Sequence, residues 1–186
     1  MYIATMAVHP KTHQPLPTTE DDRTPIVWFN GPQHPLSNLY HCHNCTITTM
    51  YNGQPFSSVE SAYQSIKAAF HNKPNLAYDI AHQDSSVYCM QLGKSIPVSA
   101  DWHKIKIPIM EPLLFAKAIY CSCYRHALNE NPCSFRERTL HLFWGGIYGR
   151  NKLGILHSAI LHKVKASLGP ILFTEIPALM SALPPL

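Results

Sequence analysis

The chain has 186 residues, of which 46% are hydrophobic and 14% are charged; this balance excludes a disordered protein and allows one domain with a full core. The formal net charge of +4 is compatible with a phosphate-bearing substrate, but it is weak evidence for nucleic-acid binding. No run of about 18 apolar residues is present, so we expect no membrane span. Six cysteines do not make a disulfide framework in a chain of this size, and we expect reduced thiols in a cytoplasmic or nuclear protein.

The N-terminal part of the chain predicts a leader, a strand and a hairpin. Residues 1–23 are rich in Pro, Thr and His and show no periodicity, so we expect a flexible leader. Ile26-Val27-Trp28-Phe29 predicts a short strand that ends at Asn30-Gly31-Pro32. Asn52-Gly53 separates two short β-type runs and favours a hairpin with a type I′ turn.

Helical patterns dominate the middle of the chain. The expected helices run from about Ser58 to Phe70, from Asn72-Lys73-Pro74 onward, from Ser86 to Leu92 with Gly93 as the cap, and from Asp101 to Asn129. Pro108 and Pro112 should break or kink the first part of the last of these regions.

The C-terminal part predicts a strand, a helix and a tail. Phe135 to Phe143 has a strand pattern, and Asn151 is a candidate cap for a final helix that ends at Leu168-Gly169. Residues 170–186 contain four prolines and form a peripheral tail. We therefore expect an α+β fold: one mainly helical domain over residues 24–169, with a small β-sheet or hairpin near its N-terminal half.

An acid, an amide and an amine share one face of the first expected helix. At about 100° per residue, Glu60, Gln64 and Lys67 fall within roughly 60° of one another. The neighbouring stripe is apolar and should face the core; it consists of Val59, Ala62, Ile66 and Phe70. Two structural explanations stay open, because Ser57 and Glu60 match a capping box and Lys67 suits a surface ion pair with Glu60 or Asp79.

Two further segments contain candidate ligand-binding groups. The loop from Gly145 to Asn151 leads into a helix, and its N–H groups, with Arg150 and Lys152 nearby, suit a phosphate. Trp102 and Trp144 suit stacking on a base, although core packing is the commoner role of such residues.

Cys42 and Cys45, flanked by His41 and His43, are compatible with half a zinc site. Buried thiols are the simpler explanation, and we expect no metal and no cofactor.

These segments together resemble the NADAR (YbiA-like) family over roughly residues 26–165. The matching motifs are F-x-G-P with P-L-S-N (Phe29 to Asn38), N-G-x-x-F-x-S-x-E-x-A-Y-Q-x-x-K-A (Asn52 to Ala68), L-G-K at Lys94, D-W-x-x-K (Asp101 to Lys104), and W-G with G-x-N-x-L-G (Trp144 to Gly154). Two positions depart from the family pattern. Lys94 stands where Arg is usual, and His141 stands where many members have an acid three residues before the tryptophan.

The resemblance implies an N-glycosidase that cleaves a ribose–amine bond. It assigns catalytic roles to Glu60, Lys67 and Asp101. The residues expected to bind substrate are Asn30, Gly31, Ser37, Asn38, Tyr63, Gln64, Lys94, Trp102, Trp144, Gly145, Arg150 and Asn151. We favour Lys67 as nucleophile and Glu60 as acid–base, and direct attack by water stays open.

The expected substrate is ADP-ribosylated guanine in nucleic acid or an ADP-ribose-like small molecule, bound by a monomer. Two alternatives stay open: phosphoribosyl-amine intermediates of riboflavin synthesis as substrates, or a non-catalytic module that binds ADP-ribose or NAD.

Overall fold

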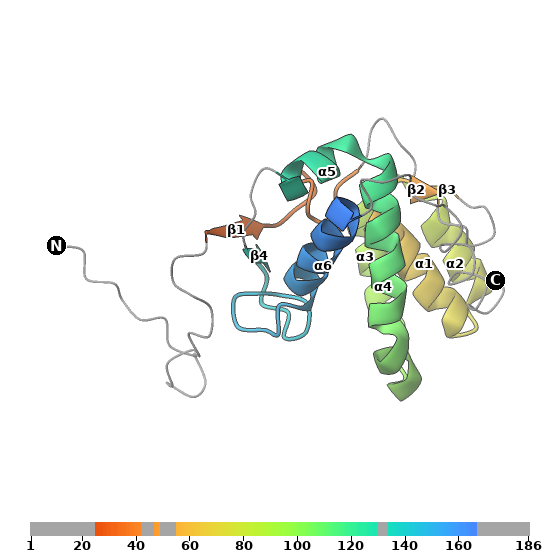
Figure 1. The fold of residues 1–186 in the computed structure, drawn as a ribbon. Helices are drawn as coiled ribbons and strands as arrows, with labels where there is room; N and C mark the ends of the chain where they lie inside the picture. Colours follow the sequence, from red (N-terminus) through yellow and green to blue (C-terminus); the bar gives the residue numbers. More distant parts are fainter. Residues whose placement is uncertain (1–24, 42–46, 49–54, 130–133, 167–186) are drawn as a thin grey trace.

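The computed structural model describes residues 25–41, 47–48, 55–129 and 134–166, which form six helices and four short strands (Figure 1). The strands are β1 (Ile26–Phe29), β2 (Ile47–Thr48), β3 (Pro55–Phe56) and β4 (Ser134–Glu137). The helices are α1 (Val59–Phe70), α2 (Pro74–Ala81), α3 (Ser86–Lys94), α4 (Ala100–Tyr120), α5 (Ser122–Asn129) and α6 (Lys152–Ala166). This is the mainly helical α+β fold expected. The predicted leader 1–23 and tail 170–186 lie outside the described residues.

The strands form two separate pairs. β2 and β3 are antiparallel, as predicted for a hairpin, and their turn at Asn52-Gly53 lies outside the described residues. β1 and β4 are parallel, with Phe29 opposite Glu137, so two segments more than 100 residues apart in the chain pair in one small sheet. The strand predicted over 135–143 is too long. β4 ends at Glu137 because β1 offers only four residues, and Thr139 N–H then donates back to Glu137 O over 2.8 Å.

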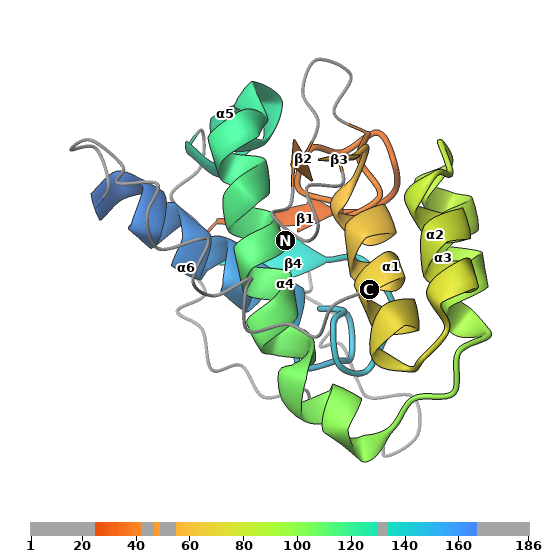
Figure 2. The same cartoon turned by 90° about the vertical axis from the view of Figure 1, so that its right-hand side faces the viewer.

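Helix α1 lies between α4 on one side and α2 and α3 on the other (Figure 2). Ser58 is its N-cap and accepts a hydrogen bond from Ser61 N–H, while the Ser61 hydroxyl accepts from Ser58 N–H. The predicted capping box of Ser57 and Glu60 is therefore wrong, since two serines make it. Every residue from Val59 to Ala68 is buried, so the polar face of α1 also points into the domain.

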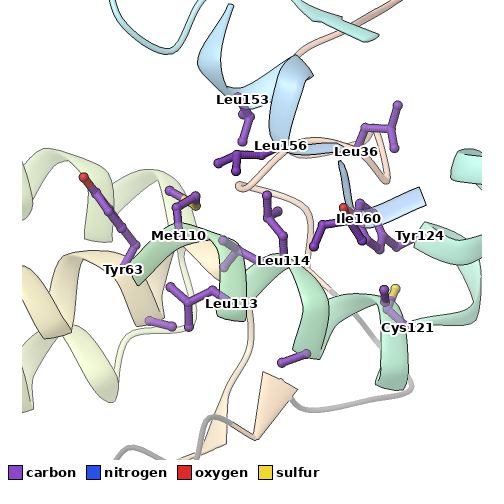
Figure 3. Close-up of a cluster of buried hydrophobic side chains, with 14 of the residues drawn as sticks. Leu36, Tyr63, Met110, Leu113, Leu114, Cys121, Tyr124, Leu153, Leu156 and Ile160 are labelled. Atoms are coloured by element: carbon purple, nitrogen blue, oxygen red, sulfur yellow. The ribbon is translucent and has the colours of Figure 1, made fainter. Parts of the chain in front are cut away.

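Helix α4 continues through Pro108 and Pro112, and the chain breaks only at Cys121, before α5. Of the predicted break or kink, the break is wrong, because packing outweighs the cost of the prolines. Each proline costs about 3 kcal/mol in a helix, whereas each fully buried large apolar side chain contributes about 1.5–3 kcal/mol. Four such residues follow or flank the prolines: Ile109, Met110, Leu113 and Leu114. Figure 3 shows Met110 beside Tyr63 of α1 and Leu114 near Leu156 and Ile160 of α6.

Two predicted helix boundaries differ from the structure. Gly93 is not a cap: it is buried inside α3, which ends at Lys94. Asn151 precedes α6 with a left-handed φ of 48°, and its Nδ2 donates to Phe135 O over 2.8 Å. Its side chain thus ties the start of α6 to β4 instead of capping the helix. The predicted end of this helix at Leu168-Gly169 lies outside the described residues.

A buried polar group fastens the loop before β2 to the helices. Lys117 of α4 is fully buried and donates from Nζ to Ser37 O over 2.7 Å. Nearby, the hydroxyl of Tyr124 and Nδ1 of buried His157 lie 2.8 Å apart. Burial, followed by the charge of Lys117, lowers the pKa of His157 to about 3. The imidazole is therefore neutral, and the cluster holds the 34–40 segment in a fixed position beside α1.

Candidate active site

A cavity of about 430 Å³ opens beside the polar face of α1. Its walls come from α1, α3, α4, β4, the segment after β4 and the start of α6. The lining residues are Asn38, Glu60, Tyr63, Gln64, Lys67, Met90, Lys94, Val98, Trp102, His103, Lys106, Met110, Glu137, Thr139, His141, Trp144 and Leu153. Eight of the residues proposed from the sequence are among them: Asn38, Glu60, Tyr63, Gln64, Lys67, Lys94, Trp102 and Trp144.

The helical stripe of Glu60, Gln64 and Lys67 forms one wall of this cavity. Gln64 Nε2 donates to Glu60 Oε1 over 2.7 Å, and Lys67 Nζ donates to Gly93 O over 2.8 Å. Glu60 and Lys67 are 9% and 8% exposed. The surface ion pair of Lys67 with Asp79 is therefore not formed, because the lysine is buried and faces α3.

Burial shifts the pKa values of Glu60 and Lys67 toward their neutral forms. The pKa of Glu60 is raised by burial, against the hydrogen bond from Gln64 and the charges of Lys67 and Lys94. The pKa of Lys67 is lowered by burial, against the charge of Glu60. An amine that loses its proton more readily than usual is a better nucleophile, and a carboxyl group that keeps its proton longer can act as an acid.

Glu137 brings a second carboxyl group to the cavity and was not predicted from the sequence. Burial raises its pKa to about 7, with a further contribution from the charge of Glu60 and an opposing one from the Thr139 hydroxyl. Side chains alternate along a strand, so Glu137 shares a face of β4 with buried Phe135. An acid two residues from a core phenylalanine in a predicted strand is the signal that would have found it.

Two buried amide oxygens of cavity residues have no donor. They are Asn38 Oδ1 and Gln64 Oε1. The Asn38 amide nitrogen lies 3.5 Å from Met110 Sδ, and the Gln64 amide nitrogen is used by Glu60. An unpaired buried acceptor costs about 1–3 kcal/mol, so a ligand that donates hydrogen bonds would relieve this cost.

The two tryptophans have different environments. Trp102 is 2% exposed and packs with Tyr63 and Phe70 at ring-centroid distances of 5.3 and 5.6 Å. It is a core anchor that contributes one edge to the cavity. Trp144 is half-buried and meets the Tyr63 ring edge-on at 6.0 Å. Burial raises the pKa of Tyr63, so its phenol stays protonated.

Asp101 does not line the cavity. Its carboxylate is exposed and accepts a hydrogen bond from Lys104 Nζ over 2.7 Å at the start of α4. This ion pair, through the hydrogen bond first, lowers the pKa of Asp101. The position of Asp101 does not support a catalytic role, whereas Glu137 lines the cavity.

The other six residues proposed for substrate binding also lie outside the cavity lining. Three shape the segment after β1: Asn30 Nδ2 donates to Arg138 O, Gly31 has a φ of 76°, and the Ser37 hydroxyl accepts from Leu39 N–H. The side chain of Asn151 donates a hydrogen bond to Phe135 O of β4, and Arg150 is exposed.

Gly145, the sixth of these residues, supports the turn after β4. A Cβ atom on it would lie 2.4 Å from Thr139 O. Any side chain at this position would collide with the backbone of Thr139, so the position requires glycine.

His141 shapes the turn that leads to Trp144. Its Nδ1 accepts hydrogen bonds from the N–H groups of Phe143 and Trp144 over 3.1 and 3.2 Å. Burial, followed by the charge of Lys106, lowers its pKa. A neutral imidazole therefore supplies the acceptor that shapes this turn, as a carboxylate would.

The described residues contain no group of three or more His, Cys, Asp or Glu side chains that could hold a metal ion. The predicted half-site at Cys42 and Cys45 lies outside the described residues. Of the cysteines that the structure describes, Cys89 and Cys121 are buried and Cys123 is exposed. No helix in the described ranges is long and apolar enough to cross a membrane.

No protein-family model and no curated protein matches the chain. Among solved structures, the NMR structure of the E. coli protein YbiA matches with a TM-score of 0.61 and 22% sequence identity. The match covers 76% of this chain and 86% of the YbiA chain. The chain has the YbiA-like α+β fold.

Proposed function

We propose that this chain belongs to the NADAR family and hydrolyses the N-glycosidic bond between a ribose and the amino group of guanine in ADP-ribosylated nucleic acid. The observation that supports this best is the convergence of a buried carboxyl group, Glu60, and a buried amine, Lys67, on one cavity. The YbiA-like fold and the sequence motifs agree with it.

The chemistry of the bond suits these groups. An amine-linked ribose opens to an imine at C1′, and the uncharged Lys67 Nζ adds to that carbon. The C1′–N bond to guanine then breaks, and the departing amine takes a proton from a carboxylic acid. Water hydrolyses the resulting Schiff base and releases the sugar and the lysine.

We assign the two carboxyl groups to different parts of this reaction. Glu137, with a pKa of about 7, is half protonated near neutral pH and suits the acid that protonates the guanine amine. Glu60 lies on the same helix face as Lys67, and we assign it the proton that the lysine nitrogen gives up once it has bonded to C1′. The amide oxygen of Asn38 has no donor and suits a hydroxyl of the pentose.

The test is to incubate the full chain with a DNA oligonucleotide carrying ADP-ribose on one guanine. We expect free ADP-ribose and unmodified DNA, detected by chromatography. A phosphoribosyl-amine intermediate of riboflavin synthesis is the comparison substrate. Faster cleavage of that compound would contradict the proposal that nucleic acid is the substrate. Tight binding of ADP-ribose without cleavage of either substrate would contradict the proposal that the protein is an enzyme.

Schiff-base attack and direct attack by water are separated by reductive trapping. With cyanoborohydride present during turnover, the imine between Lys67 and the sugar is reduced to a stable amine. We expect a mass increase on the peptide that contains Lys67. Turnover that leaves the protein mass unchanged would indicate attack by water.

A further inference from the structure

Lys106 on α4 is a buried cation that no described carboxyl group neutralises. It is 9% exposed and lines the cavity. Its ammonium lies 3.3 Å from the centroid of the Phe143 ring and 3.2 Å from Nδ1 of His103. The two ion pairs found within the described ranges, Lys104–Asp101 and Lys163–Glu111, do not include it.

The contacts that Lys106 makes do not offset the free-energy cost of removing its ammonium group from water. The effective cost of removing an ammonium from water is several kcal/mol, and a cation–π contact returns about 2 kcal/mol when it is desolvated. The charge that acts on Lys106 is that of Arg150, and Lys106 in turn acts on His141. This end of the cavity therefore concentrates positive charge.

The carboxyl groups lie in a different electrostatic neighbourhood. Glu60 interacts with Lys67, Lys94 and Glu137, and none of the interactions that shift Lys106 involves an acid. The cavity thus has a part beside α1 where two carboxyl groups are balanced by two lysines, and a cationic part beside the N-terminal third of α4. A ligand that is neutral at its reacting end and anionic at the other end complements this distribution.

We propose that Lys106 and His103 form a phosphate subsite that takes the phosphate on C5′ of the bound ribose. The inference rests on the proposed function for the position of the sugar, whose C1′ lies toward Glu60 and Lys67. Lys106 Nζ uses one N–H on His103 and has further donors for phosphate oxygens. Because His103 Nδ1 accepts that bond, its Nε2 carries a hydrogen and is a second donor.

The test compares the binding of ribose 5-phosphate and ribose by NMR titration of the full chain. Lys106→Met removes the charge and keeps the length of the side chain. Lys104→Met is the matched control, because Lys104 lies two residues away on α4 and its side chain is 74% exposed. Hydrogen bonds to charged groups contribute about 1.5–3 kcal/mol, so we expect Lys106→Met to weaken ribose 5-phosphate binding about 10-fold or more.

The expected pattern is specific: ribose binding stays unchanged in Lys106→Met, and both sugars bind Lys104→Met as they bind the wild type. Equal binding of ribose and ribose 5-phosphate by the wild type, or loss of both sugars in Lys106→Met, overturns the proposal. If Lys106→Met does not fold, His103→Ala serves instead. It removes one donor and should weaken ribose 5-phosphate binding by about 5-fold.

A third titration, with ADP-ribose, identifies the source of the phosphate. An equal loss in Lys106→Met indicates that the subsite takes the diphosphate of ADP-ribose, and no loss indicates a terminal monoester. Binding needs no turnover, so these results are independent of cleavage. A chain that fails to cleave ADP-ribosyl-guanine yet shows the expected loss keeps the subsite and contradicts only the proposed function.

Discussion

Gln64 donates a hydrogen bond of 2.7 Å to the carboxyl group of Glu60, one turn earlier on α1. The same amide lies against α3, where a Cβ atom on Gly93 would come within 1.9 Å of Gln64 Oε1. Helix α3 therefore fixes the Gln64 side chain, and Gln64 fixes the carboxyl group. Gly93 O also accepts from Lys67 Nζ, so one residue of α3 positions both proposed catalytic groups.

The Glu60→Gln variant should lose activity without losing stability. The cap of α1 is made by Ser58 and Ser61, and the glutamine side chain can still accept from Gln64. We expect the rate to fall by about 10²–10⁴-fold and the melting temperature to stay close to that of the wild type, because glutamine has nearly the same volume and keeps the hydrogen bond from Gln64. Ser58→Ala is the control and should cost about 1 kcal/mol of stability. A melting temperature that falls as far in Glu60→Gln as in Ser58→Ala would mean that Glu60 is structural.

Gly93→Ala should disturb both the packing of α3 and the reaction. The added methyl group overlaps the Gln64 amide, and overpacking of a filled core costs about 1–3 kcal/mol. Urea unfolding measures this loss. Shortening the partner in Gly93→Ala/Gln64→Ala should recover part of the stability but not the activity. A single variant as stable as the wild type would show that α1 and α3 are not in close contact here.

Glu137 should make both rate and stability depend on pH. Its pKa is raised from 4.5 to about 7 in the folded chain, so the folded state holds the proton more tightly than the unfolded state. Its contribution to stability is therefore fully present below about pH 4.5 and is lost as the pH rises to about 7. As an acid it should also make the rate decline above about pH 7.

Glu137→Gln tests both effects. The difference in unfolding free energy between wild type and variant should change between pH 4.5 and 7 and stay constant at higher pH. The high-pH decline in rate should disappear, together with about 10²–10⁴-fold of the rate. A difference that does not vary with pH would show that Glu137 titrates normally.

His141 should be replaceable by an acid but not by alanine. Its role is to accept from the N–H groups of Phe143 and Trp144, and the carboxylate of His141→Asp can do the same. His141→Ala leaves these groups without their acceptor and should cost about 1 kcal/mol of stability. Chemical denaturation of the two variants side by side checks this, and an equal loss in both would remove the turn-shaping role.

The helical face of α1 was predictable because Glu60, Gln64 and Lys67 lie at positions whose angular relation is fixed by the helix. The N-cap of α1 was not predictable, because Ser57 and Ser58 are adjacent and both can cap a helix. Only the packed structure selects Ser58. The prolines of α4 misled for a related reason. Local propensity opposes the helix there, and the buried residues that override it gain their contacts only from α1 and α6.

The rest of the cavity depended on contacts between distant segments. Glu137 reaches α1 only because β4 pairs with β1, more than 100 residues earlier in the chain, and no local pattern specifies that pairing. Asn151 and Asp101 belong to recognisable motifs, yet neither lines the cavity. Asn151 donates a hydrogen bond to Phe135 O, and Asp101 forms an ion pair with Lys104. A motif identifies an arrangement of residue types, and the three-dimensional contacts decide which of its members line the cavity.

The most direct test of the central claim is the rate at which Lys67→Met releases ADP-ribose from ADP-ribosyl-guanine DNA. The wild type and the exposed-lysine variant Lys104→Met are the references. Methionine fills the volume of Lys67 without an amine, so the cavity should persist. We expect Lys104→Met to match the wild type and Lys67→Met to lose about 10²–10⁴-fold while remaining folded by circular dichroism. A folded Lys67→Met protein that releases ADP-ribose at the wild-type rate would contradict the claim that the amine beside Glu60 takes part in breaking the bond.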